Sequence, residues 1–147
     1  MKTTIGSLML ANAALFFFGA IQHAGVALGP FHEPYIIHAA IVETLCGLAL
    51  LCGVLALLRN WKKSWSAALT ANLIALAGVL LGIAALAVGA GPRIASNDLY
   101  HRLMLILIAL GTVALFFQRP RVECLIALLS QLARRQAAQD WKIWIFC

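Results

Sequence analysis

Three histidines and one glutamate are the residues of this sequence whose types could do chemistry while lying within long apolar runs. They are His23, His38, Glu43 and His101. Neutral imidazole can bind a transition metal, ligate haem or donate a hydrogen bond to a quinone carbonyl. An ionisable group inside an apolar helix is costly and usually faces a bundle interior or a cavity. We therefore treat all four as a candidate ligand-binding site, with the three histidines as candidate metal ligands.

Four apolar segments must position these residues, and each is long enough to cross a hydrocarbon core of about 30 Å as a helix. The predicted spans are 5–28, 35–58, 66–90 and 99–117. Because the connections are short, neighbouring helices must run in opposite directions. The first run is longer than the apolar region of a signal peptide, about 7–15 residues, so we expect a membrane span there. The predicted fold class is an all-α membrane protein, a four-transmembrane antiparallel helix bundle.

The composition indicates that lipid surrounds most of the chain. Hydrophobic residues make up 63% of the chain and charged residues 11%, with a mean hydropathy of +0.95. A soluble domain is about half apolar and a quarter charged, so this chain has too few polar side chains to cover a water-exposed surface. Four cysteines are present without C-x-x-C spacing, and we expect no disulfide.

Basic residues gather at one predicted end of the bundle. Lys2, the 59–63 link and the tail after Phe117 hold one, three and five of them, nine of the eleven in the chain. The positive-inside rule then predicts both termini in the cytoplasm. We expect a bacterial inner-membrane protein. All four tryptophans lie on that inner side and both tyrosines on the outer side. Charge placed in this way is an orientation signal, so we expect no nucleic-acid partner despite the net charge of +6.

Two further patterns concern partners of the bundle. Gly78, Gly82 and Gly89 form a small-residue stripe on the third span, which favours close helix contact with another subunit or a second copy. The tail, 118–147, carries leucines at helical spacing among basic residues. We expect it to form an amphipathic helix on the inner leaflet, in contact with membrane lipids.

The polar residues differ in their predicted depth within the membrane. Glu43 lies deepest, about 12 Å into the second span by helix rise, whereas the histidines lie nearer the outer edge. His32 and Glu33 fall in the first outer loop. Asn97 and Asp98 precede the predicted fourth span, where such residues commonly cap a helix.

Five hypotheses fit this outer cluster. In the first, Glu43 pairs with His23 or His38 and has only a structural role. The others are a quinone pocket, a copper or zinc site made by three imidazoles and Glu43, haem held by His23 and His101, and a proton-coupled transporter that uses Glu43. No nucleophile–base pair, phosphate-binding loop or paired carboxylates are present, so nothing points to a self-contained enzyme.

The second span resembles the second helix of DoxX-like proteins, which are also four-helix bacterial membrane proteins. The resemblance rests on Glu43, Gly47, Leu50 and Gly53 at matching offsets. It implies an accessory or quinone-linked subunit of a membrane oxidoreductase, with Glu43 as the matching polar position. The histidines have no counterpart that the resemblance carries over. We therefore expect an accessory subunit of a membrane redox system, or a subunit that binds a quinone or another lipophilic ligand, with a polar site in the outer half of the bundle. The alternatives are a non-catalytic structural subunit and a small transporter.

Overall fold

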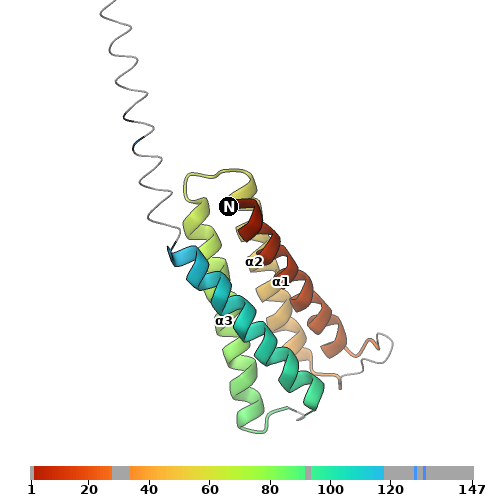
Figure 1. The fold of residues 1–147 in the computed structure, drawn as a ribbon. Helices are drawn as coiled ribbons and strands as arrows, with labels where there is room; N and C mark the ends of the chain where they lie inside the picture. Colours follow the sequence, from red (N-terminus) through yellow and green to blue (C-terminus); the bar gives the residue numbers. More distant parts are fainter. Residues whose placement is uncertain (1, 28–33, 92–93, 118–127, 129–130, 132–147) are drawn as a thin grey trace, which may run out of the picture. The chain divides into compact units, whose positions relative to one another are not determined.

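The computed structural model describes residues 2–27, 34–91, 94–117, 128 and 131, and these residues form helices and connections without a strand. Helix α1 spans Lys2–His23, α2 spans Ile37–Leu58 and α3 spans Ser64–Ala87. A fourth helix follows at Ala95–Phe117. Each of the four is long and apolar enough to cross a membrane, as the composition predicts. The helices follow one another along the chain in the colour order of Figure 1.

Several helix ends differ from the predicted ones, and a glycine accounts for the end of α1. Helix α1 ends at His23, before the predicted end at 28. Gly25 has a positive φ of +84°, and a right-handed helix cannot continue through that conformation. The amide of Ile36 then donates to the carbonyl oxygen of His23 at 2.8 Å, just before α2 begins. The fourth helix begins at Ala95, before the predicted start at 99. Asn97 and Asp98 therefore lie inside its first turn.

Small residues bring the helices into contact. Gly53 of α2 lies beside Met9 of α1 and Ala71 of α3, and Gly47 lies beside the ring of Phe17. The end of α2 therefore packs near the start of α1. Leucine, valine and alanine side chains between these points complete a buried apolar core. Most large apolar residues outside the core are exposed, as expected for side chains that face lipid.

The fourth helix packs on both α1 and α3. Near its end, the carbonyl oxygen of Leu115 accepts a hydrogen bond from the buried indole nitrogen of Trp65 at 3.0 Å. Near its start, the hydroxyl of Tyr100 donates to the carbonyl oxygen of Leu15 at 3.3 Å. These contacts lie within one compact unit, Met1–Leu115, and a second unit covers Phe116–Cys147. The predicted tail helix lies outside the described residues, apart from Leu128 and Gln131.

Candidate functional site

The candidate site centres on Glu43, which lies in the second turn of α2 and is only 6% exposed. His23 is the last residue of α1 and is 3% exposed. Its Nδ1 atom lies 3.9 Å from Oε2 of Glu43. The two helices thus bring a buried carboxyl group close to a buried imidazole. Within a membrane, such ionisable groups usually face the interior of the protein and not the lipid.

Tyr100 brings the fourth helix to the same point. Its hydroxyl is hydrogen-bonded to the side chain of Glu43 in addition to the carbonyl of Leu15. A β-carbon added at Gly19 would lie 2.7 Å from the Tyr100 hydroxyl oxygen and 2.8 and 2.9 Å from the two carboxyl oxygens of Glu43. An alanine at this position would therefore require Tyr100 or Glu43 to shift. Gly19 and His23 are four residues apart, so one face of α1 serves the whole cluster.

His101 is buried, 9% exposed, and its contacts lie elsewhere. Its Nδ1 atom lies 2.9 Å from the carbonyl oxygen of Asn97. Because a carbonyl oxygen can only accept, Nδ1 carries the proton, and Nε2 has the lone pair in the neutral ring. Nε2 lies against the α-carbon of Gly82 on α3, so close that no side chain would fit there. The ring also meets Tyr100 edge-on, with centroids 5.4 Å apart.

The predicted metal ligands do not share one environment. His38 is exposed on the first turn of α2, whereas His23 and His101 are buried. Within 2–27, 34–91 and 94–117, no three His, Cys, Asp or Glu side chains gather so that they could hold a metal ion. His32 and Glu33 lie outside the described residues. Metal or haem ligation by the histidines stays a prediction.

The glycine stripe of the third span is used within the chain. Gly78 lies against the thiol of Cys46 on α2, and Gly82 lies against His101. Gly89 follows the end of α3 with a positive φ of +78° and meets no atom within 4 Å of its β-carbon position. Contact with another subunit through these glycines stays a prediction.

Several polar residues of the buried interior escaped the sequence analysis. Asn12, Gln22 and Asn72 are at most 8% exposed although they lie in apolar helices. Tyr100 was noted only as an outer-side aromatic residue. A carboxamide inside a predicted span is a usable signal, because lipid offers it no hydrogen-bond partner. The role of Gly19 had no such signal, since glycine is common in membrane helices.

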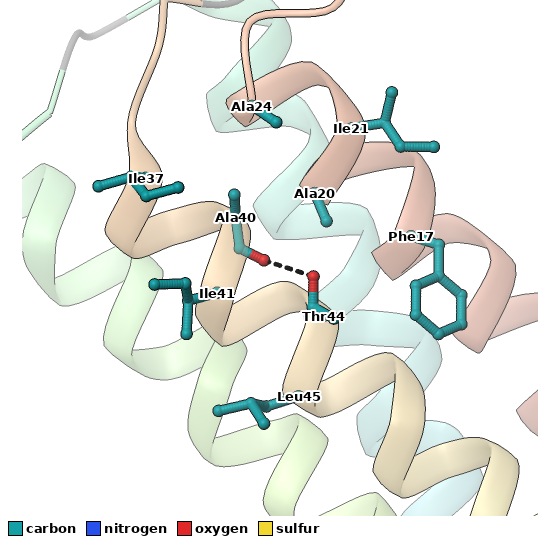
Figure 2. Close-up of a pocket in the computed structure, with 9 residues that line it drawn as sticks. All are labelled: Phe17, Ala20, Ile21, Ala24, Ile37, Ala40, Ile41, Thr44 and Leu45. Atoms are coloured by element: carbon teal, nitrogen blue, oxygen red, sulfur yellow. Dashed lines mark hydrogen bonds between the residues drawn. The ribbon is translucent and has the colours of Figure 1, made fainter.

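An open apolar groove runs between α1 and α2 beside the candidate site, with a volume of about 580 Å³. Figure 2 shows the side chains that line the groove, among them Thr44, whose hydroxyl donates to the carbonyl of Ala40 at 2.7 Å. The lining residues are Phe17, Ala20 and Ile21 of α1, Ala24 in the turn just after α1, and Ile37, Ala40, Ile41, Thr44 and Leu45 of α2.

The groove and the polar pair are neighbours on the same two helices. Ala20 precedes His23 by three residues on α1, and Ala40 precedes Glu43 by three on α2. Residues three apart are adjacent on a helix surface. Both alanines line the groove and are 6% and 7% exposed, whereas His23 and Glu43 are not among its lining residues.

Comparison with known proteins adds no relative: no family model, no curated protein and no solved structure matches this chain. The resemblance of the second span to DoxX-like proteins stays a prediction. The four apolar helices are consistent with an integral membrane protein in contact with lipid.

Proposed function

We propose that this chain is a multi-pass inner-membrane protein that binds a lipophilic carbonyl compound, with quinones as the chemical class, in the groove between α1 and α2. The observation that supports this most directly is the placement of an apolar groove of about 580 Å³ beside the buried His23–Glu43 pair. Ligand sites are typically apolar clefts with a few convergent polar groups. An isoprenoid tail suits the groove, and a carbonyl headgroup suits an imidazole donor.

The same proposal includes the arrangement of the chain in the membrane. The contacts of Gly53 with Met9 and of Glu43 with His23 support antiparallel packing of α1 and α2. The basic residues support a bundle with both termini in the cytoplasm and the polar pair nearer the outer face. With a quinone bound there, the chain would act as an accessory subunit of a membrane redox system, as the resemblance to DoxX-like proteins implies.

The test is to fill the groove without touching the polar pair. Ala24 is an exposed groove residue, so Ala24→Phe places a ring in the groove at little cost to packing. Ala14→Phe is the matched control, since Ala14 is exposed on α1 and does not line the groove. Each variant is purified in mild detergent, incubated with a short-tail ubiquinone and examined by native mass spectrometry.

We expect the unmodified chain and Ala14→Phe to retain one quinone, and Ala24→Phe to lose it. Glu43→Gln and His23→Gln should weaken retention with the groove open. Equal retention by Ala24→Phe and Ala14→Phe would refute the groove as the site. If no quinone is retained by the unmodified chain either, the ligand class is wrong.

A second function, proton-coupled transport, is favoured by the position of Glu43 within a membrane helix and its contacts with two other helices. Buried carboxyl groups of this kind commonly relay protons. The chain would be placed in liposomes with a trapped pH dye and a potassium–valinomycin potential. If Glu43 carries the proton, the unmodified chain should take up protons and Glu43→Gln should abolish this uptake. The control His38→Gln, which changes an exposed residue, should leave the uptake unchanged. Uptake that is unaffected by Glu43→Gln would eliminate this function.

A further inference from the structure

A second groove lies where α3 ends and the fourth helix begins, and it shares no lining residue with the groove between α1 and α2. Its volume is about 480 Å³. Its apolar wall includes Ile83, Leu86 and Ala87 of α3, with Ile94 just before the fourth helix. Residues three and four apart lie on one face of a helix, so the end of α3 offers the groove a continuous apolar surface.

Two charged side chains complete the wall of this groove. Asp98 and Arg102 lie one turn apart on the fourth helix, and both line the groove. Nη2 of Arg102 lies 2.7 Å from Oδ2 of Asp98, and both side chains are more than half exposed. A guanidinium group has five N–H donors and a carboxylate has two acceptor oxygens, so this one contact leaves each group able to bind a ligand. A cation and an anion thus lie side by side at an apolar groove.

The groove lies at the level where lipid headgroups meet the hydrocarbon core. Helices of this length cross the core, so their ends lie near the headgroups. Asp98 is in the first turn of the fourth helix, and Arg102 lies about 10 Å from the helix start by helix rise. An arginine at that depth extends its long side chain to the interface. Ile83 lies about 6 Å deeper along α3 than Ala87, so the apolar wall continues toward the core.

The two charges select among phospholipids. Every phospholipid has an acyl chain for the apolar wall and a phosphate for the guanidinium group of Arg102. A net anionic headgroup would gain nothing from the carboxylate of Asp98 and would be repelled by it. A choline headgroup has a cation without an N–H donor. An ethanolamine headgroup carries a phosphate and a primary ammonium group with three N–H donors, so it complements both side chains.

We propose that the groove between α3 and the fourth helix binds one phospholipid with an ethanolamine headgroup. Its phosphate lies at Arg102, its ammonium group at Asp98, and one acyl chain lies along Ile83 and Leu86. Two carbons separate the ammonium group from the phosphate ester, a spacing suited to side chains one turn apart, whose β-carbons are about 5–6 Å apart. This site is independent of the quinone proposed for the other groove, and either proposal can fail alone.

The experiment is native mass spectrometry of the full chain in mild detergent, titrated with three phospholipids that carry identical acyl chains. These are phosphatidylethanolamine, phosphatidylcholine and phosphatidylglycerol. The first phosphatidylethanolamine should bind about threefold to fivefold more tightly than either of the others, as expected for one exposed charge pair. Asp98→Asn should remove this preference, because all three lipids keep their phosphate contact. Arg102→Gln should weaken the first binding step of all three.

Filling the groove tests the position of the lipid. Ala87→Phe places a ring in the groove and should remove the preference for phosphatidylethanolamine. Ala84→Phe is the matched control, since Ala84 is exposed on α3 and does not line the groove, and it should keep the preference. Thermal unfolding in the same detergent checks that each variant is folded.

Equal affinity of the unmodified chain for the three lipids would overturn the proposal, because it would show unselective lipid contact, and this measurement needs no variant to fold. Tighter binding of phosphatidylglycerol would show a site for anionic lipid instead. A preference for phosphatidylethanolamine that persists in folded Asp98→Asn or Ala87→Phe would show that the selective site lies elsewhere on the chain.

Discussion

The two buried histidines, His23 and His101, lie at different contacts between helices and have different neighbours. At the first contact, His23 of α1 lies 3.9 Å from Glu43 of α2, and Tyr100 joins them from the fourth helix. At the second, His101 bonds to the carbonyl of Asn97 on its own helix and presses its ring on Gly82 of α3. The first contact joins polar side chains of three helices. The second satisfies the imidazole locally and uses the ring for packing.

The difference separates a candidate site from a packing element. Polar groups that meet from several helices depend on one another, so a change at one residue leaves the others without a partner. An imidazole bonded within its own helix keeps that bond when neighbouring helices change. We therefore expect functional effects around Glu43 and mainly packing effects around His101.

The largest effect is expected at Gly19. Gly19→Ala forces a methyl group against the Tyr100 hydroxyl and both carboxyl oxygens of Glu43, so it should destabilise the fold by about 2–4 kcal/mol. Gly6→Ala on the same helix meets nothing within 4 Å and should be neutral or stabilising. Thermal unfolding in one detergent measures both. Equal stability of the two variants would contradict the crowding at Gly19.

The next effect concerns coupling between Glu43 and Tyr100. A double-mutant cycle with Glu43→Gln and Tyr100→Phe should give an interaction free energy of about 1 kcal/mol, because the side chains share a hydrogen bond. The matched cycle of Glu43→Gln with His101→Phe should give a value close to zero. Denaturant unfolding of the single and double variants supplies both cycles. A larger coupling in the His101 cycle would reverse the comparison.

A similar effect should appear at the packing contact. Gly82→Ala places a methyl group in the ring of His101 and should cost about 1 kcal/mol or more. In a His101→Ala background the same change should cost nothing, because the ring that it meets is gone. Thermal unfolding of the four chains provides the measurement. An unchanged penalty in the His101→Ala background would show that another group causes it.

The smallest effect is expected for the exposed ion pair of the fourth helix. Arg102 Nη2 lies 2.7 Å from Asp98 Oδ2, but the side chains are 71% and 55% exposed. Exposed pairs four residues apart contribute less than about 0.5 kcal/mol and weaken with salt. Arg102→Gln should therefore leave the unfolding temperature within about 1–2 °C of the unmodified value. A large loss of stability would mean that Arg102 has a further role in the bundle.

Much of the helix content was predictable, whereas several ends and contacts were not. The spans follow from local hydropathy, and α2 ends at 58 as predicted. The first span was predicted to continue to 28, but α1 ends at His23 because the backbone turns at Gly25. Glu43 and His23 stand out by type in apolar runs, but the partnership with Tyr100 depends on how the fourth helix packs.

The sequence by itself determined four apolar helices, since the transfer of a segment into lipid depends on the sum of its own side chains. Only the tertiary structure decided which faces meet. Apolar residues cover every side of these helices, so no amphipathic stripe marks the inward face. In the folded bundle the helices approach closely at Gly19 and Gly82, where Tyr100 lies beside Glu43 and His101 lies against α3.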